Sequence, residues 1–352
     1  LPIFIAIYKD QIDIVKIIID QDVFKANCEY QNANPLVFAA INNKTEIFRF
    51  LLEKNLFKLN KMYNNMSLFE YTIQNEGFEI ADSIIRQPSI TIFSEFSSYF
   101  AEIEPNKYLE ESTTLIEQTD NDSDFEDSYA FNLIHFFDQK NSNDECINQV
   151  VQKNKEFLAC IAAQYLNEDE FVGFLEKFKI EVSSIYKENK LTPIISSIAN
   201  KKYDVLKIII TKYKDEVNIN SAYLPMELTA LHILSYQKRQ LREGDKILLS
   251  LNDLDVNKHE KTHSFTPLHL AVLNHNCEFI RLLLNHPGID INCQDCENNT
   301  PLHHAFSFRI SCSLGISFET NIEVLKLLLD CTNKKIDTIA KNKRVPFLVF
   351  FY

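Results

Sequence analysis

The segment from Phe265 to Leu284 places the strongest constraint on how this chain can fold. Thr266 is suited to cap a helix, and Pro267 fits the first helical position because that position needs no N–H donor. The apolar residues that follow recur with helical spacing, as do those of a second run, Phe279 to Leu284. Pro287-Gly288 should end the second helix, because proline cannot continue it and glycine can take the left-handed closing turn. The segment therefore predicts a pair of short helices joined by a turn.

Related helix starts recur along the chain at regular spacing. Aligned on Pro267, the equivalent positions are Pro2, Pro35, Ser67, Pro193, Ala230, Pro267, Pro301 and Pro346. The steps between them are 33 and 32 for the first three positions and 37, 37, 34 and 45 for the last five. A period of about 33 residues indicates a repeat architecture rather than two or three ordinary domains.

Four of these starts are close to one another in sequence. They read Leu-Thr-Pro-Ile-Ile-Ser at 191–196, Leu-Thr-Ala-Leu-His-Ile at 228–233, Phe-Thr-Pro-Leu-His-Leu at 265–270 and Asn-Thr-Pro-Leu-His-His at 299–304. Together with the phrase Ile-Asp-Ile-Asn-Cys-Gln-Asp at 289–295, they resemble the ankyrin repeat family. The resemblance is strong over 191–352, good over 1–87 and weak between them. It implies an all-α, ankyrin-type helical-hairpin solenoid of roughly eight to ten hairpins, several of them degenerate.

One position of the resemblance predicts an unusual backbone conformation. Asn298 stands where the family usually has glycine, and Ser264 and Lys190 occupy the same place in earlier repeats. Asparagine tolerates the left-handed region better than other residues that carry a Cβ. We expect Asn298 to fit this position well, and Ser264 and Lys190 to fit it less comfortably.

The repeats and the segments between them predict four regions. Residues 1–87 are N-terminal ankyrin repeats, of which the third, 66–87, is degenerate. Residues 88–128 form an acidic loop or linker, too charged and too poor in apolar residues to bury much surface. Residues 129–190 hold two divergent helical hairpins, 129–137 with 145–151 and 157–166 with 168–178. Residues 191–352 are C-terminal ankyrin repeats, the last one truncated, and both ends of the chain suggest a fragment of a longer array.

Charge and hydropathy exclude several classes of protein. The formal net charge is −13, and nine of these net charges fall between Glu102 and Asp127, where ten acids face one lysine. No basic face is present, so nucleic-acid binding is not expected. No apolar run approaches the roughly 20 residues of a membrane span, and no signal peptide is recognisable. The eight cysteines form no dense framework, which favours reduced thiols and a cytoplasmic, or alternatively nuclear, location.

A metal site is one interpretation of the C-terminal cysteines. Cys293 and Cys296 have the spacing of zinc ligands, with His303 and His304 close behind. The repeat alignment gives three of the four a structural explanation, because Cys293 takes a small-residue position, Cys296 a variable tip position and His303 the histidine of Thr-Pro-Leu-His. We therefore predict no metal and no other cofactor.

Three histidines, His232, His269 and His303, could suggest general base chemistry. Each lies at the same repeat position, and the resemblance implies that this histidine bonds the helix-start threonine and neighbouring backbone. No glycine-rich phosphate loop, nucleophile elbow or kinase motif is present. We predict no catalytic residues, and no enzyme activity in this chain.

Binding of a protein partner is the function that the resemblance implies. The hairpin tips and the neighbouring helix faces of such an array are not needed for stacking. Family positions carried onto this sequence are Tyr30, Gln31, Ile41, Thr262, His263, Phe265, Leu273, Cys296, Glu297, Asn299 and Ser307. Phe265 and Tyr30 are the expected anchors, because aromatic residues carry much interface energy and no stacking contact is expected to require Phe265. The alternative is that these tips are merely solvated.

Two further hypotheses remain open from the sequence. Thr119 and Ser123 are each followed by an acid at the third position, which suggests phosphorylation of the acidic segment; the alternative is a plain solvated loop. The expected function is a scaffold that recruits a protein partner, and the acidity is compatible with a basic or extended peptide. The alternative is the ankyrin portion of a larger enzyme or membrane channel whose working domain lies outside this chain.

Overall fold

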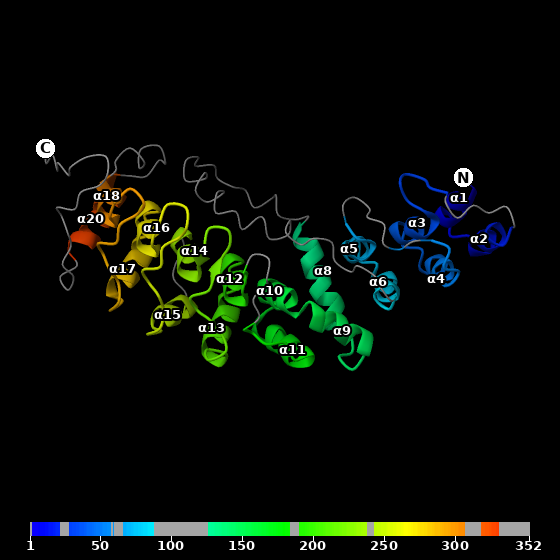
Figure 1. The fold of residues 1–352 in the computed structure, drawn as a ribbon, viewed down its shortest axis with the longest axis horizontal. Coiled ribbons are helices and arrows are strands. Elements are labelled where there is room, and N and C mark those ends of the chain that lie inside the picture. Colours follow the sequence, from blue (N-terminus) through cyan, green and yellow to red (C-terminus); the bar gives the residue numbers. More distant parts are fainter. Residues whose placement is uncertain are drawn as a thin grey trace. The chain divides into compact units, whose positions relative to one another are not determined.

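The computed structural model describes residues 2–21, 28–57, 59, 66–87, 126–183, 190–237, 243–306 and 318–330. These residues fall into two compact units, one ending at Asn154 and the other beginning at Lys155. We call them unit 1 and unit 2. In both, helices follow one another as hairpins, and Figure 1 shows each hairpin contributing one helix to each of two layers.

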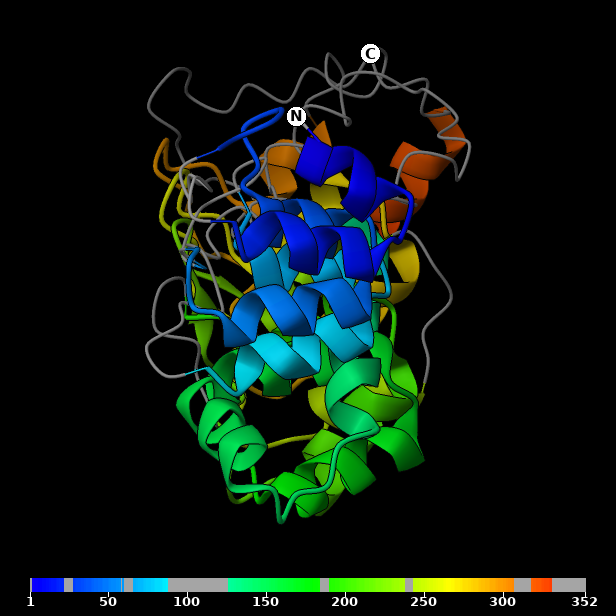
Figure 2. The same ribbon diagram turned by 90° about the vertical axis from the view of Figure 1, so that its right-hand side faces the viewer.

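The described residues of unit 1 form four hairpins. Its first layer consists of α1 (Pro2–Tyr8), α3 (Pro35–Ile41), α5 (Leu68–Gln74) and α8 (Glu126–Asp138). Its second layer consists of α2 (Ile12–Ile19), α4 (Thr45–Glu53), α6 (Phe78–Ile85) and α9 (Glu145–Lys153). Each helix packs on its neighbours in the same layer and on its hairpin partner or the adjoining hairpin. Figure 2 shows the blue to cyan helices of this unit lying roughly parallel, one hairpin upon the next.

Unit 2 repeats the same arrangement. Its first layer consists of α10 (Lys155–Tyr165), α12 (Pro193–Ala199), α14 (Ala230–Tyr236), α16 (Pro267–Leu273) and α18 (Pro301–Phe306). Its second layer consists of α11 (Glu168–Phe178), α13 (Tyr203–Lys212), α15 (Glu243–Leu249), α17 (Cys277–Asn285) and α20 (Phe318–Leu329). Two short antiparallel strands, β1 (Ala222–Tyr223) and β2 (Leu228–Thr229), pair Ala222 with Thr229 and Tyr223 with Leu228 just before α14. The predicted all-α hairpin solenoid is confirmed, with this small sheet as an addition.

Stacking buries the same position in several hairpins, although in the first hairpin that position, Ile14, is 43% exposed. The third residue of the second helix is Ile47, Ile80, Val205 and Phe279 in four of them, and each is at most 1% exposed. Because the neighbouring hairpin covers this position, the core runs from one hairpin to the next within each unit. Among the described helices, none is long and apolar enough to cross a membrane.

Helix starts follow the predicted capping rules. Thr266 adopts an extended conformation, accepts a hydrogen bond from the His269 backbone N–H, and is followed by Pro267 at the start of α16. The alignment of Ser67 with the helix-start proline is wrong by one residue: Ser67 is the N-cap, equivalent to Thr266, and Leu68 stands at the proline position. Ser67 forms a reciprocal capping box with Glu70. The third hairpin thus keeps a well-defined start without the Thr-Pro pair.

The predicted end of α17 is wrong in its mechanism. The helix does end before Pro287, at Asn285, but Gly288 does not take the left-handed conformation. His286 is extended, with ψ 132°, because the residue before a proline is pushed out of the helical region. Proline alone therefore ends the helix, and the glycine N–H bonds to Nδ1 of His286 at 3.1 Å.

Left-handed backbone is confirmed at the three positions aligned with the family glycine. The φ angles of Lys190, Ser264 and Asn298 are 57°, 59° and 63°. Glu227 occupies the same place before β2, with φ 58°. A Cβ in this region costs roughly 1–2 kcal/mol, and asparagine is among the residues that visit it routinely. The tip loops of unit 2 therefore tolerate strain that glycine would relieve.

The two divergent hairpins are present and are divided between the units. Helices α8 and α9 belong to unit 1, whereas α10 and α11 belong to unit 2. Helix α8 begins at Glu126, inside the segment predicted as acidic loop, so that prediction extended three residues too far. Residues 88–125 and residues 345–352, which were predicted to begin a last repeat, lie outside the described residues, as do Thr119 and Ser123.

Ion pairs attach the last hairpin of unit 1 to the one before it. Arg86, at the end of α6, contacts Asp82 at 3.0 Å and Asp144, the N-cap of α9, at 2.8 Å. Lys140 contacts Asp82 at 2.7 Å and lies over the Phe136 ring. These charges lie where the repeat pattern is weak, so they support a junction that sequence periodicity alone did not specify.

Candidate partner-binding surface

The tip loops of unit 2 are short closed turns. Glu260 N–H donates to the Phe265 carbonyl at 2.9 Å, and Asp295 N–H donates to the Asn299 carbonyl at 2.9 Å. We call residues 260–265 and 295–299 the first and second tip loops. Each precedes a Thr-Pro helix start, α16 or α18, so each loop is fixed at one end by a helix cap.

A buried carboxylate supports each tip loop from within. Glu260 is 4% exposed and accepts hydrogen bonds from the backbone N–H groups of Thr262 and His263 at 2.6 Å and of Phe265 at 3.1 Å. These bonds satisfy donors that the turn would otherwise leave unpaired. Each loop conformation is therefore fixed by an acid rather than by glycine.

Asp295 has the equivalent role in the second tip loop. Its carboxylate accepts from the backbone N–H groups of Glu297 at 2.8 Å and Asn299 at 2.7 Å, from the Asn299 amide at 3.1 Å and from Nε2 of His304 at 2.8 Å. Burial by itself raises the pKa of Asp295, but the bonds from His304 and Asn299 outweigh it and hold the pKa well below its usual range. The group is therefore an anion in the folded protein at neutral pH.

Backbone hydrogen bonds join neighbouring tips. Lys261 N–H donates to the Met226 carbonyl at 2.8 Å, and Cys296 N–H donates to the His263 carbonyl at 2.8 Å. The loop before α14, the first tip loop and the second tip loop therefore form one connected edge of unit 2. A pre-organised edge of this kind loses little conformational entropy when it binds.

The predicted residues of unit 2 divide into two groups. Thr262 is exposed, and His263 and Glu297 are half-buried, all on the tip loops. Leu273 is half-buried at the end of α16, and Ser307 lies outside the described residues. Thr262, His263 and Glu297 thus present side chains at the edge while their backbone N–H groups are held by Glu260 or Asp295.

Phe265 does not behave as predicted, because it is used in stacking. Its ring is half-buried and stacks on His263 and His269, with centroids 5.1 and 5.9 Å away, and meets the edge of His304 at 5.4 Å. His304 belongs to the following repeat, so the ring bridges two repeats. The expectation that no stacking contact requires Phe265 is therefore wrong, and only part of its ring is available to a partner.

The repeated histidines have the structural role that the resemblance implied. Nδ1 of His269 accepts from the Thr266 backbone N–H at 3.2 Å, so Nε2 carries the proton and donates to the Asn299 carbonyl at 3.0 Å. His232 makes the same bonds to Thr229 and to the Phe265 carbonyl. Burial lowers the pKa of His232 to about 4 and that of His269 to about 3. These buried neutral rings have both nitrogens occupied by structural bonds.

The remaining histidines and the cysteines of this region also have other partners. Nδ1 of His303 accepts from the Thr300 backbone N–H at 3.1 Å, and His304 is bonded to Asp295. Burial, followed by the charge of Asp290, raises the pKa of Cys293 to about 12, which opposes the thiolate that a metal requires. Within the described segments, no three His, Cys, Asp or Glu side chains come together in a way that could hold a metal ion.

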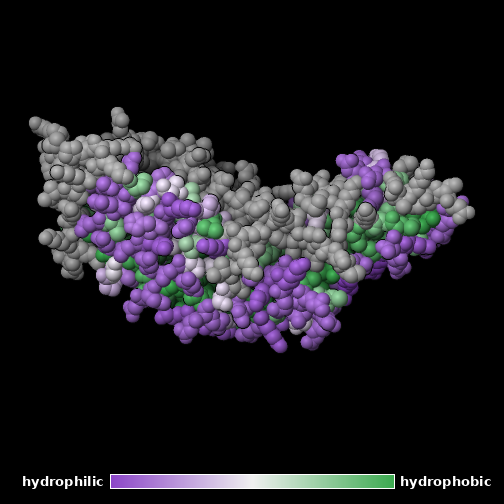
Figure 3. Space-filling model, viewed as in Figure 1, coloured by the Kyte–Doolittle hydropathy of each residue, from purple (hydrophilic) through white to green (hydrophobic). Residues whose placement is uncertain are grey.

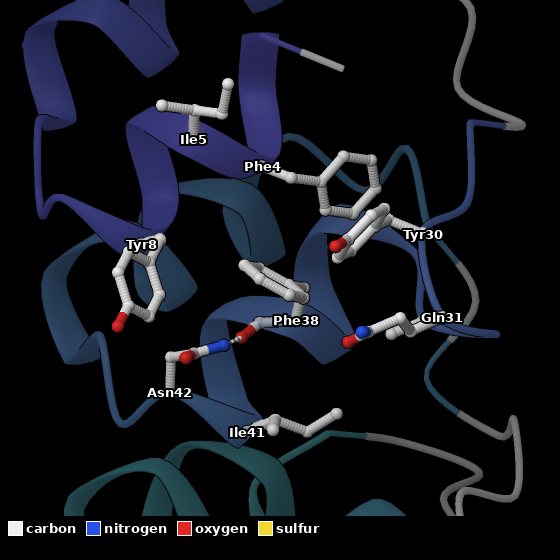
Figure 4. Close-up of a pocket in the computed structure, with 9 residues that line it drawn as sticks. Phe4, Ile5, Tyr8, Tyr30, Gln31, Phe38, Ile41 and Asn42 are labelled. Atoms are coloured by element: carbon white, nitrogen blue, oxygen red, sulfur yellow. Dashed lines mark hydrogen bonds between the residues drawn. The ribbon is translucent and has the colours of Figure 1, made fainter.

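A second candidate surface lies in unit 1, where three predicted residues come together. Tyr30, Gln31 and Ile41 line a pocket of about 520 Å³ between α1, α3 and the loop before α3 (Figure 4). We call it the N-terminal pocket; its lining is Phe4, Ile5, Tyr8, Tyr30, Gln31, Ala33, Phe38, Ile41 and Asn42. In Figure 3, hydrophobic residues gather on the visible face over α1 to α4.

A tight turn positions Tyr30 and Gln31 at the pocket. Tyr30 and Ala33 exchange backbone hydrogen bonds of 3.0 Å, and Gln31 and Asn32 have φ angles of 50° and 61°. Positive φ at both central residues is the geometry of a type I′ turn. Tyr30 leaves this turn with its ring against Phe4 and Phe38, and 47% of the residue remains exposed.

Sequence reasoning missed part of both surfaces. The pocket residues Ile5 and Tyr8 lie 33 residues before Phe38 and Ile41, so the repeat spacing that identified Ile41 could have identified them. Glu260 and Asp295 also have a signal, an acid six or five residues before the helix-start threonine. Their function in holding the tips depends on burial, which the spacing does not show.

Comparison with known proteins agrees with the repeat pattern. A family model described as ankyrin repeats (3 copies) matches residues 2–92 and 231–342, more than half of the chain. No curated protein matches the chain.

Proposed function

Because the chain belongs to the ankyrin repeat family, we propose that it is a scaffold that recruits a protein partner and performs no catalysis of its own. Ankyrin repeats are generally protein–protein interaction modules, since stacking leaves one edge of the array free for other contacts. The buried, doubly bonded histidines support the absence of catalysis, because the residue type best suited to acid–base chemistry is used for structure.

The partner, in this proposal, binds on the tip loops and the adjacent first-layer helices. The observation that carries this is the support of the tips by Glu260 and Asp295, which holds the loops from the buried side. Thr262 is then exposed, and Glu297 partly exposed, on a rigid edge. Rigid edges with side chains unused in stacking favour recognition of another protein.

A cytoplasmic or nuclear location is part of the same proposal. Five cysteines of the described segments, Cys28, Cys146, Cys160, Cys277 and Cys293, are free thiols, which supports a reducing compartment. A protein partner in that compartment, rather than a nucleic acid, is favoured by the net charge of −13, which opposes contact with phosphates.

Site-specific photocrosslinking tests the proposed surface. A photoreactive phenylalanine derivative replaces the exposed Thr262 in one variant and the exposed Asn285, at the far end of α17, in the matched control. In the native cell extract, we expect protein adducts from position 262 that position 285 does not give. The purified adduct partner should then bind the wild-type protein directly. Identical adducts from both positions, or none from position 262, would refute the proposed surface.

A further inference from the structure

The N-terminal pocket of unit 1 indicates which kind of side chain a partner would insert. Resting on the proposed function as a protein-binding scaffold, we propose that this pocket takes one uncharged aromatic or aliphatic side chain from a partner peptide. The side chain acts as the anchor of the peptide, and Gln31 contacts the peptide backbone beside it.

The floor of the pocket is rigid. Phe4, Tyr30 and Phe38 contact one another with ring centroids 5.2 to 6.0 Å apart, and the Phe4–Phe38 pair is edge-to-face. Phe4 is 3% exposed, so this cluster is tied to the core of the first two hairpins. Close-packed rings of this kind do not collapse into the adjoining space. The pocket therefore exists before a ligand arrives, and its volume of about 520 Å³ lies in the usual range of ligand sites.

The walls of the pocket are apolar and unusually exposed. Ile5, Tyr8 and Tyr30 are 57%, 67% and 47% exposed, and they face the pocket from α1 and from the turn before α3 (Figure 4). An apolar side chain that enters would remove these surfaces from water, which is the main driving force for association. Tyrosine at a pocket rim is also among the residue types that carry most binding energy in interfaces.

Charge decides the class of the anchor. None of the nine lining residues bears a formal charge at neutral pH. A lysine, arginine or carboxylate tip that entered would lose its hydration without meeting an opposite charge, and that cost exceeds the gain from apolar contact. An uncharged anchor thus matches the uncharged lining of the pocket.

Two amides define the polar part of the rim. The Asn42 amide N–H donates to the Phe38 carbonyl at 2.8 Å, which leaves its carbonyl oxygen as an acceptor. Gln31 is exposed at the tip of the turn, where its amide offers both a donor and an acceptor. A peptide backbone carries the same two groups, so a peptide satisfies the rim while its side chain enters the pocket.

Two exposed isoleucines of the first hairpin provide a matched test. Ile5 lines the pocket, whereas Ile17 is 62% exposed on α2 and does not line it. Ile5→Asp and Ile17→Asp introduce the same charge on the same hairpin, and both positions are exposed enough to keep the fold, which circular dichroism checks. Random peptides displayed on phage are selected on the wild-type protein, and the enriched peptides are synthesised. Their affinity for wild type, for both variants and for Tyr30→Ala is measured by fluorescence anisotropy.

The proposal expects enriched peptides to share an uncharged aromatic or aliphatic residue. Their affinity should fall about tenfold or more in Ile5→Asp and in Tyr30→Ala, and stay unchanged in Ile17→Asp. Replacing the shared residue by alanine or lysine should have an effect as large as Ile5→Asp.

Several outcomes would overturn the proposal that the N-terminal pocket takes an uncharged anchor. No enrichment, enrichment of charged anchors, or equal affinity for Ile5→Asp and wild type would each do so. Self-association of the wild type that Ile5→Asp abolishes, seen by sedimentation, would identify a second copy as the occupant instead. Thr262 belongs to unit 2 and the N-terminal pocket to unit 1. The crosslinking experiment can therefore fail while the peptide-binding experiment succeeds, and the reverse.

Discussion

Removal of the Asp295 carboxylate is the most direct test of how the tip loops are held. Asp295→Ala leaves the backbone N–H groups of Glu297 and Asn299 without their acceptor, together with the His304 ring. A buried donor without a partner costs roughly 1–3 kcal/mol. Two backbone donors lose their acceptor, and water can replace part of the lost hydrogen bonding. We therefore expect the unfolding free energy to fall by about 3 kcal/mol.

The assay is urea denaturation followed by circular dichroism, together with hydrogen exchange of the peptide that contains the second tip loop. The matched control is Gln294→Ala, which removes an exposed side chain next to Asp295 and should change stability by less than about 0.5 kcal/mol. The amides of Glu297 and Asn299 should lose protection in Asp295→Ala and keep it in the control. A loss in Asp295→Ala no larger than in Gln294→Ala would refute the role of the carboxylate.

Asp295 should also make the unfolding free energy depend on pH. The folded-state pKa of Asp295 is lowered, so its contribution is present above the unfolded pKa of about 4 and is lost as pH falls below it. Asp295→Asn keeps the shape without the charge. Its unfolding free energy should therefore change less than that of the wild type as pH falls from 5 towards 3.

Three other perturbations have defined outcomes. Ser264→Gly should raise the unfolding free energy by about 0.5–1 kcal/mol because it relieves a left-handed Cβ, while Asn298→Gly, at the equivalent position, should change the urea midpoint less. Arg86→Ala should cost at most about 1 kcal/mol at low salt and nothing measurable at high salt, because its ion pairs are half-exposed; denaturation at two salt concentrations checks this. His232 and His269 have lowered folded-state pKa values, so the unfolded state binds more protons below pH 6.5 and stability falls as pH falls. Each contributes a loss of about 2 kcal/mol by pH 5, and His269→Gln should lose less than the wild type between pH 7 and pH 5.

The helices could be predicted because their signals are local. Caps such as Thr266, the proline after it and the spacing of apolar residues each act within one or two turns. Repetition of these signals then predicted the hairpin architecture, even in the degenerate third hairpin, where Ser67 is the cap and Leu68 stands at the proline position. The closing turn at Gly288 was predicted wrongly because proline had already ended the helix one residue earlier.

The candidate surfaces were only partly predictable because they depend on contacts between repeats. Family positions led to Tyr30, Gln31 and Ile41, and the structure brings these three into one pocket. The same reasoning misjudged Phe265, since its ring meets a histidine of the following repeat, thirty-nine positions away in the sequence. A position in one repeat does not reveal which rings the neighbouring repeat places against it.

The sequence by itself determined the repeat, its period, its helix caps and the left-handed positions, because each depends on residues close together in the chain. Only the tertiary structure decided which polar groups are buried and what they hold. Glu260 and Asp295 are ordinary tip acids in the sequence and become the supports of the tip loops once stacking excludes water from them. Likewise, Ile5 and Tyr8 become walls of a pocket only when the second hairpin brings Phe38 and Ile41 against the first.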